Sequence, residues 1–191
     1  MIAIIDYGAG NIFSVKNALD YLGLESRLVS DKESVKAADA VILPGVGAFG
    51  DCMKNIREKG LFEEILKMTA DKPLLGICLG MQLLFERSYE YGVHEGLGLI
   101  KGCVKPIADV ALGLKVPQIG WNALIFKRDP SPIFRYIQNG DHVYFVHSYY
   151  AADCEESVIA DCEYGAYLTA AVACGNVYGC QFHPEKSGDV G

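Results

Sequence analysis

Over about its first ninety residues the chain alternates short apolar runs with stretches of helical periodicity. Each apolar run stops at Gly, Pro or a charged residue, and apolar side chains then recur three or four positions apart. Such alternation produces right-handed βαβ units, so it predicts a parallel sheet with helices on both faces. Asn11 is expected to cap the first helix and Gly23 to end it. We expect strands at 1–6, 25–30, 40–43 and 74–78, and helices at 12–22, 34–38, 48–58, 61–69 and 79–87.

After Gly92 the pattern changes to short runs of β character, with one short helix expected at 132–137. A hairpin is expected where Gly175-Asn176 separates 170–174 from 177–182. No linker or repeat divides the chain, so residues 1–191 are expected to form a single α/β domain in three layers, with a mostly parallel but mixed central sheet and a β-rich second half. The other β runs are 98–106, 116–126, 142–151 and 157–163.

Net charge and hydropathy argue against some classes of binding partner. The 17 Lys and Arg residues against 24 Asp and Glu residues give a formal net charge of -7, with no basic block. That balance argues against a nucleic-acid surface or an anionic membrane as partner. The start lacks the basic region of a signal peptide, and no apolar run approaches the ~18–20 residues that span a bilayer. We therefore expect a soluble protein.

The seven cysteines are odd in number and contain no Cys-x-x-Cys pair. This argues against both a disulfide framework and a zinc cage, and no metal or cofactor is expected. Reduced thiols in the cytoplasm fit this pattern.

One cysteine stands in a segment with chemical character, Gly76-Ile77-Cys78-Leu79-Gly80. It is a Gly-x-Cys-x-Gly version of the nucleophile elbow, in which small flanking residues permit a sharp turn from strand to helix. At the start of a helix, free N–H groups and the helix dipole favour the thiolate of Cys78. The backbone N–H of Leu79 would point to where an oxyanion develops. The alternative interpretation, a buried structural cysteine, applies better to the other six.

A thiolate nucleophile needs a base, and His183 is the strongest of the four histidines. Pro184 holds the preceding residue extended, so His183 and Glu185 project to the same side. Glu185 can then orient the imidazole as the third member of a triad. His94 and His142 lie in polar contexts, and His147 ends an apolar run as either a neighbour of the site or a core residue.

Two further segments bear on the site. Pro44-Gly45-Val46-Gly47 follows a buried strand and could supply a second oxyanion N–H, or form only a turn; a phosphate loop is excluded because no Lys-Ser/Thr follows. Gln82 lies four residues after Cys78, so it faces the same side of the expected helix. It would hydrogen bond a polar substrate or be solvated. Gly8-Ala9-Gly10 is discarded as a dinucleotide fingerprint, because Phe13 occupies its third glycine position.

Together, Pro44-Gly45-Val46-Gly47, Gly76–Gln82 and His183-Pro184-Glu185 resemble the triad-type, class I glutamine amidotransferases. Within that family, four segments resemble the glutaminase subunits of imidazole glycerol phosphate synthases, and the resemblance covers essentially the whole chain. They are Ile5–Asn11, Gly45–Phe49, Pro117–Asn122 and Val146–Tyr149. The family continues with a helix after its His-Pro-Glu-Lys-Ser segment, whereas this sequence ends at Gly191.

The resemblance implies that the chain hydrolyses glutamine to glutamate and ammonia with Cys78, His183 and Glu185, through a glutamyl thioester. It implies an oxyanion hole made of Leu79, Val46 and Gly47, in which the peptide near Val46 reorients. It also implies that substrate contacts come from Gly45, Gly47, Gln82, His147, Ser148 and Tyr149.

The resemblance further implies a partner. In the family, ammonia passes into a (βα)8-barrel synthase that makes imidazole glycerol phosphate and an aminoimidazole ribonucleotide in histidine biosynthesis. A heterodimer is therefore expected. Its contacts would include Trp121, Asn122, Tyr149 and Lys186. The alternatives are a sibling amidotransferase for the pyridoxal phosphate or anthranilate pathway, and a non-catalytic subunit or cysteine-based stress protein of similar sheet architecture.

Overall fold

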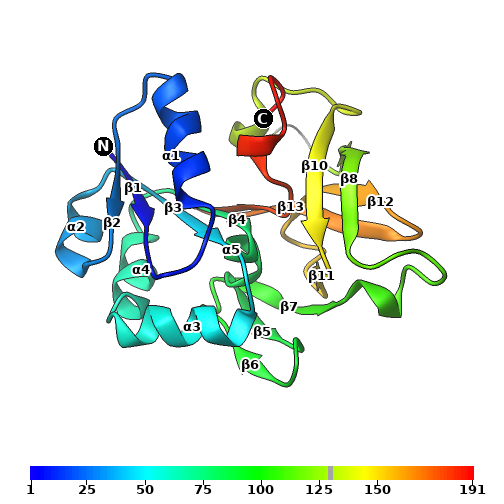
Figure 1. Cartoon of the computed structure of the whole chain (residues 1–191), viewed down its shortest axis with the longest axis horizontal. Coiled ribbons are helices and arrows are strands. Elements are labelled where there is room, and N and C mark those ends of the chain that lie inside the picture. The colour runs from blue at the N-terminus through cyan, green and yellow to red at the C-terminus, as the bar shows by residue number, and fades with distance from the viewer. Residues whose placement is uncertain (129–130) are drawn as a thin grey trace.

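The central feature of the computed structural model, which describes residues 1–128 and 131–191, is a mixed sheet of eight strands (Figure 1). The strand order is β2-β1-β3-β4-β14-β13-β12-β9. From β2 to β14 neighbouring strands run parallel, and β13, β12 and β9 extend the sheet antiparallel. The bounds are β1 Ile2–Ile5, β2 Ser26–Val29, β3 Ala40–Gly45, β4 Leu74–Cys78, β9 Ile125–Phe126, β12 Val158–Glu163, β13 Tyr167–Cys174 and β14 Val177–Cys180.

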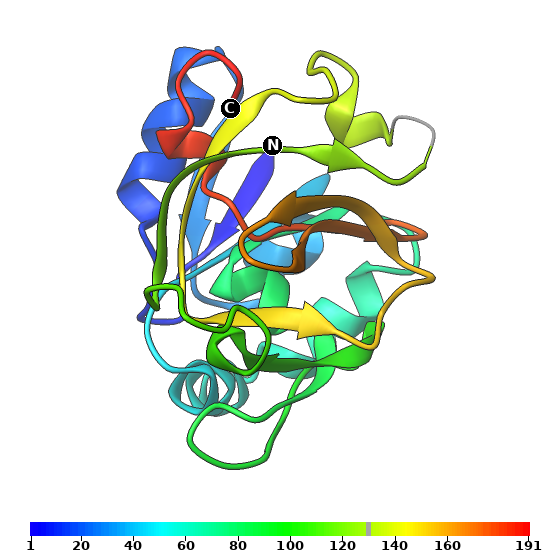
Figure 2. The same cartoon turned by 90° about the vertical axis from the view of Figure 1, so that its right-hand side faces the viewer.

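Both faces of this sheet are covered, because its central strands are apolar on both sides. In β1, Ala3 and Ile5 belong to one core and Ile4 belongs to the other. The first core also contains side chains of α2, α3 and α4, and the second contains those of α1. Figure 2 shows α1 on one side of the sheet and α3 on the other. The bounds are α1 Ile12–Tyr21, α2 Lys32–Ala37, α3 Phe49–Glu58 and α4 Phe62–Met68.

The second half adds two smaller sheets. A two-stranded ribbon, β10-β8, lies on the α1 face, where Val143 and Phe145 join the core. A four-stranded sheet, β11-β7-β5-β6, lies on the opposite face, where Phe85 and Val104 join the other core. The three-layer α/β arrangement with a β-rich second half is thus confirmed. The bounds are β5 Phe85–Ser88, β6 His94–Glu95, β7 Ile100–Pro106, β8 Gln118–Ala123, β10 His142–His147 and β11 Tyr149–Ala152.

The predicted helix at 79–87 is wrong beyond its first turn. Helix α5 spans Leu79–Gln82 only, and β5 begins at Phe85. Leu83, Leu84 and Phe85 are all fully buried, so this segment has no polar face for a helix to expose. Phe85 instead pairs with Ile100 of β7.

Local signals at the ends of elements have mixed outcomes. Gly23 follows α1 with φ 70°, as a glycine that ends a helix should. Asn11 immediately precedes α1, but its side chain makes no capping hydrogen bond. The hairpin of β13 and β14 turns at Gly175-Asn176, as predicted. The helix expected at 132–137 is a single 3₁₀ turn, Pro132–Phe134.

Within the described residues, no helix is long and apolar enough to cross a membrane.

Candidate active site

Cys78 stands at the turn from β4 to α5, where the backbone adopts φ 55° and ψ −114°. A positive φ is rare for a residue other than glycine and costs conformational energy. The turn is tight because glycines let three backbones meet. A Cβ on Gly80 would lie 1.8 Å from the carbonyl oxygen of Leu43, and one on Gly76 would lie 2.6 Å from the Gly80 oxygen. This is the packing reason for the Gly-x-Cys-x-Gly pattern.

His183 and Glu185 lie beside this turn. Strand β14 runs parallel to β4 with Cys180 opposite Ile77, so the residues that follow β14 reach the level of Cys78. The imidazole Nδ1 lies 2.8 Å from Oε1 of Glu185, and both side chains are buried. The backbone of His183 is fixed too, because its N–H donates to the Tyr144 oxygen over 2.9 Å. The sequence-predicted base and orienting carboxylate are therefore in contact.

The charge state of His183 follows from its neighbours. Burial by itself lowers the pKa of His183, but hydrogen bonds with Cys78 and Glu185, and the charges of both groups, raise it to about 9. Since Nδ1 faces the carboxylate, Nε2 is left for the thiol. At neutral pH this arrangement favours an imidazolium next to Cys78.

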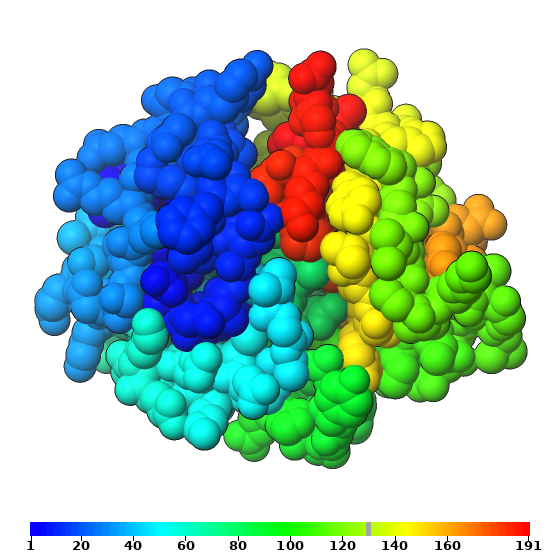
Figure 3. All heavy atoms as spheres, in the orientation of Figure 1, coloured from blue at the N-terminus to red at the C-terminus, as the bar shows by residue number. Residues whose placement is uncertain are grey.

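A cavity of about 500 Å³ opens at this point. The cyan segment after β3, the yellow β10 and the red C-terminal segment border a hollow in Figure 3. Most of the sequence-predicted site residues line the cavity, but Gly45, Glu185, Trp121 and Asn122 do not. Those that do are Val46, Gly47, Cys78, Leu79, Gln82, His147, Ser148, Tyr149, His183 and Lys186.

The segment expected to complete an oxyanion hole borders this cavity. Gly47 has φ 104°, a conformation open to glycine, and nothing lies within 4 Å of the position where its Cβ would be. The Sγ of Cys52 lies 3.7 Å from the Val46 oxygen. Gly45 has a steric role instead: a Cβ there would lie 2.6 Å from the Gly80 nitrogen.

His147 is a buried, neutral imidazole. Burial lowers its pKa to about 4. Its Nδ1 lies 2.7 Å from the Tyr149 oxygen, and because a carbonyl only accepts, Nδ1 carries the proton. Its Nε2 is then an acceptor, and it is buried with no partner among residues 1–128 and 131–191. Sequence reasoning left its role open; the structure places it on the cavity wall.

The four residues expected at a partner interface do not share one surface. Trp121 is half exposed and packs edge-on against Tyr144, at 6.0 Å between ring centroids, on the outer face of the β10-β8 ribbon. Asn122 points to the inner face, where it donates to the Glu163 oxygen over 3.0 Å. Tyr149 and Lys186 belong to the cavity wall.

Two residues of the site were missed by sequence reasoning. Gln181 is fully buried, with its Nε2 3.6 Å from Sγ of Cys78. The available signal was its position two residues before His183 in an extended segment. Glu90 lines the cavity and accepts a hydrogen bond from the N–H of Phe49 at the start of α3. No motif or periodicity marks Glu90.

The other cysteines make no rival site. All seven are free thiols, and Cys174 alone is exposed. Burial raises the pKa of Cys52, Cys103 and Cys154 to about 11. In the part of the chain that the structure describes, no group of three or more His, Cys, Asp or Glu residues is placed to hold a metal.

Comparison with known proteins gives a consistent result. A family model described as glutamine amidotransferase class-I matches residues 3–191. The chain is 49% identical to the imidazole glycerol phosphate synthase subunit HisH of Caldanaerobacter subterraneus subsp. tengcongensis, covering 100% of this chain and 93% of that protein. It is 50% identical to the subunit of the same name from a Geobacillus species, covering 100% and 92%.

Solved structures agree at the level of the fold. A crystal structure described as a glutamine amidotransferase superimposes with a TM-score of 0.78 at 23% identity, covering 100% of this chain and 94% of that one.

Proposed function

This chain belongs to the class-I glutamine amidotransferases, and on that premise we propose that it is the glutaminase subunit of an imidazole glycerol phosphate synthase in histidine biosynthesis. It acts as one domain that releases ammonia from glutamine. The observation that carries the proposal is the buried His183–Glu185 pair beside Cys78 at a glycine-lined elbow. The chain is about 50% identical to HisH subunits over almost their full length, and this supports the assignment to histidine biosynthesis.

The proposed reaction begins from a Cys78 thiolate and a His183 imidazolium. The thiolate attacks the side-chain amide carbon of glutamine, and the developing oxyanion is held by the N–H of Leu79 and an N–H of the Gly45–Gly47 segment. His183 gives its Nε2 proton to the amide nitrogen, so ammonia leaves and a glutamyl thioester remains. Neutral His183 then takes a proton from water, hydroxide attacks the thioester, and glutamate leaves as the thiolate returns.

The other side chains of the cavity hold the reactants in this scheme. Glu185 accepts from Nδ1 of His183 and directs Nε2 at the sulfur. Gly47 and Gln82, with the turn at His147–Tyr149, are proposed to grip the amino-acid part of glutamine. His147 stays neutral beside a charged His183, because burial lowers its pKa to about 4.

We propose further that the ammonia passes to a (βα)8-barrel synthase bound as a heterodimer. The outer face of the β10-β8 ribbon supports this, since Trp121 and Ile119 are 52% and 60% exposed there. Aromatic side chains are enriched at protein–protein interfaces. Lys186 and Tyr149, near the mouth of the cavity, would lie where ammonia leaves.

A covalent label tests the chemistry. A glutamine-like electrophile, such as a chloroketone of glutamine, should modify Cys78 and no other cysteine, with glutamine protecting. Peptide mass mapping locates the adduct, and Cys78→Ser should abolish it. Labelling of exposed Cys174 in place of Cys78 would contradict the proposal and favour a non-catalytic subunit.

A further inference from the structure

Two buried glutamines connect the nucleophile to the turn between β10 and β11. The amide Nε2 of Gln82 donates to the Tyr149 oxygen over 3.0 Å and to Oε1 of Gln181 over 2.8 Å. The Nε2 of Gln181 lies 3.6 Å from Sγ of Cys78. Gln181 is 0% exposed and Gln82 is 5% exposed, so water does not compete for these bonds.

The donor and acceptor of each hydrogen bond in this row are fixed by the Tyr149 carbonyl. A backbone carbonyl only accepts, so the Tyr149 oxygen requires the NH₂ group of Gln82. The second hydrogen of that NH₂ group then requires the oxygen of Gln181. Gln181 is left with its own NH₂ group toward the sulfur, because turning its amide around would place two NH₂ groups against each other.

The backbone of Gln181 is also hydrogen bonded. Its N–H donates to the Ala170 oxygen over 2.8 Å. Gln181 follows Cys180, which pairs with Ile77, so Gln181 lies at the level of Cys78 in the neighbouring strand. The sulfur therefore has an amide donor beside it, in the cavity that His183 also lines.

We propose that Gln181 is a further catalytic residue, whose amide N–H hydrogen bonds to the Cys78 thiolate and holds it ready for attack. The inference rests on the proposed glutaminase function. An amide nitrogen offers no acceptor, so this bond is stronger when the sulfur is charged. The Val146 oxygen, 3.9 Å from Sγ, can pair only with the protonated thiol. The two neighbours thus favour opposite protonation states, and the shorter contact favours the reactive one.

The pH profile of alkylation tests the proposal without needing turnover. Iodoacetamide reacts with thiolates, so the rate at Cys78, followed by peptide mass mapping in the full chain, reports its ionisation. Gln181→Leu keeps the approximate volume but removes the donor. We expect the midpoint of the Cys78 profile to move up by about one pH unit. We expect kcat for glutamine to fall about tenfold with little change in KM.

Gln181→Glu tests the proposed bond in the opposite sense, because it replaces the donor beside the sulfur with an acceptor. The carboxylate still accepts from Gln82 but presents an acceptor to the sulfur. If Gln181 acts on the thiolate, Gln181→Glu should shift the midpoint upward by more than Gln181→Leu. If Gln181 only supports Gln82, Gln181→Leu should lower kcat while the midpoint of the Cys78 profile stays at the wild-type value, and that result would overturn the inference.

A matched control is available in the same chain. Gln118 is also fully buried and donates to a cysteine sulfur, that of Cys162, over 3.7 Å. Gln118→Leu should leave the midpoint of the Cys78 profile unchanged, and exposed Cys174 serves as internal reference in every sample. Circular dichroism and thermal melting confirm that each variant is folded.

The outcomes separate the two hypotheses. A reactive Cys78 whose midpoint is the same in the wild type and Gln181→Leu overturns the role of Gln181 and leaves the glutaminase intact. A wild-type Cys78 that reacts at no pH contradicts the proposed function itself.

Discussion

At the scale of single residues, the charge of His183 determines when the site is competent. Its pKa of about 9 lies above the ordinary 6.5, because hydrogen bonds with Cys78 and Glu185 outweigh burial. A pKa raised on folding means that the folded state binds the proton more tightly. The resulting stabilisation is therefore fully present below pH 6.5 and is lost as pH rises through about 9.

We predict an alkaline limb in kcat/KM for glutamine near pH 9, where His183 loses the proton that ammonia needs to leave. Glu185→Gln should lower kcat by about 10²-fold or more. It should also move that limb to lower pH, because the carboxylate that raises the pKa of His183 is gone. A pH–rate series on both proteins measures this. A limb that stays near pH 9 in the variant would show that Glu185 does not control His183.

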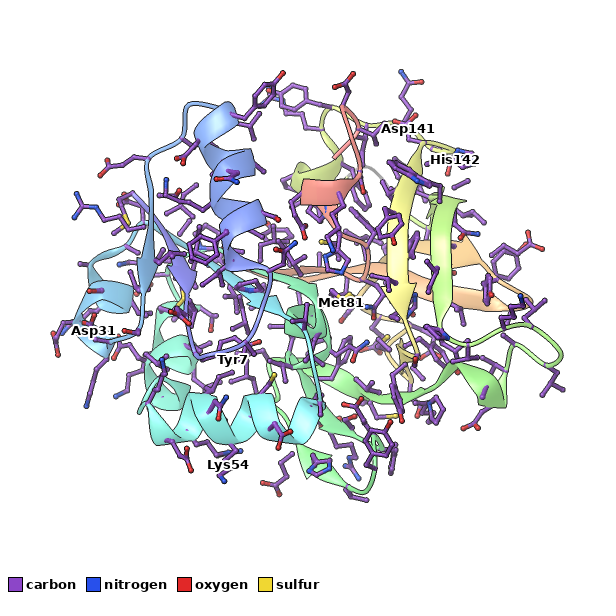
Figure 4. The ribbon with its side chains drawn as sticks, in the orientation of Figure 1. Tyr7, Asp31, Lys54, Met81, Asp141 and His142 are labelled. Carbon is purple, nitrogen blue, oxygen red and sulfur yellow. The ribbon has the colours of Figure 1, made fainter. Side chains whose placement is uncertain are left out.

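At the scale of elements, the elbow depends on close backbone approach between β3, β4 and α5. Met81 of α5 and Tyr7, which follows β1, are both fully buried, and both are labelled in Figure 4. Tyr7 donates to the Pro44 oxygen over 2.7 Å and so fixes the end of β3. This packing keeps Cys78 at the cavity, and the four residues of α5 that follow it are buried.

Gly80→Ala should destabilise the fold by about 4 kcal/mol or more, because its Cβ would lie 1.8 Å from the backbone oxygen of Leu43, which cannot move without breaking β3. Gly23→Ala is the matched control. It has φ 70° and nothing within 4 Å, so it should cost only the ~1–2 kcal/mol of a left-handed alanine. Urea unfolding measures both. Equal losses would mean that the close approach does not limit the elbow.

Sequence patterns predicted the elements whose signals are local. Runs such as 40–43 and 74–78 are apolar on both faces and bounded by Gly or Pro, which specifies a buried strand. The residues Leu83–Phe85 carry no such boundary, and pairing with β7 decides their conformation. Cys78 and His183 were predicted from motifs. Gln181 was not, because its meaning depends on the register of β14 against β4, which no local pattern encodes.

At the scale of the whole molecule, the two faces of the β10-β8 ribbon have different tasks. Its inner face carries His147 to the cavity wall, and its outer face carries Trp121 and Tyr144 to the surface. One ribbon therefore connects the proposed docking surface to the proposed active site. Successive side chains of a strand point to opposite faces, so Asn122 points inward where Trp121 points outward.

Trp121→Ala should weaken binding of the barrel synthase about 30-fold, as expected for a central aromatic residue of an interface. Tyr21→Ala, which truncates an 89% exposed aromatic residue at the end of α1, is the control and should change affinity little. Isothermal titration of the partner measures both variants. If Tyr21→Ala weakens binding and Trp121→Ala does not, the partner docks at the C-terminal end of α1 and not on the ribbon.

The most direct measurement is glutamate release from glutamine by the full chain, alone and mixed with the barrel synthase and its ribonucleotide substrate, beside Cys78→Ala. We expect slow release by the chain alone, strong stimulation in the complete mixture, and no release with Cys78→Ala. Release that persists in Cys78→Ala, or none in any mixture, would contradict the proposed chemistry. Release that the barrel synthase does not change would keep the chemistry and assign the chain to a sibling pathway.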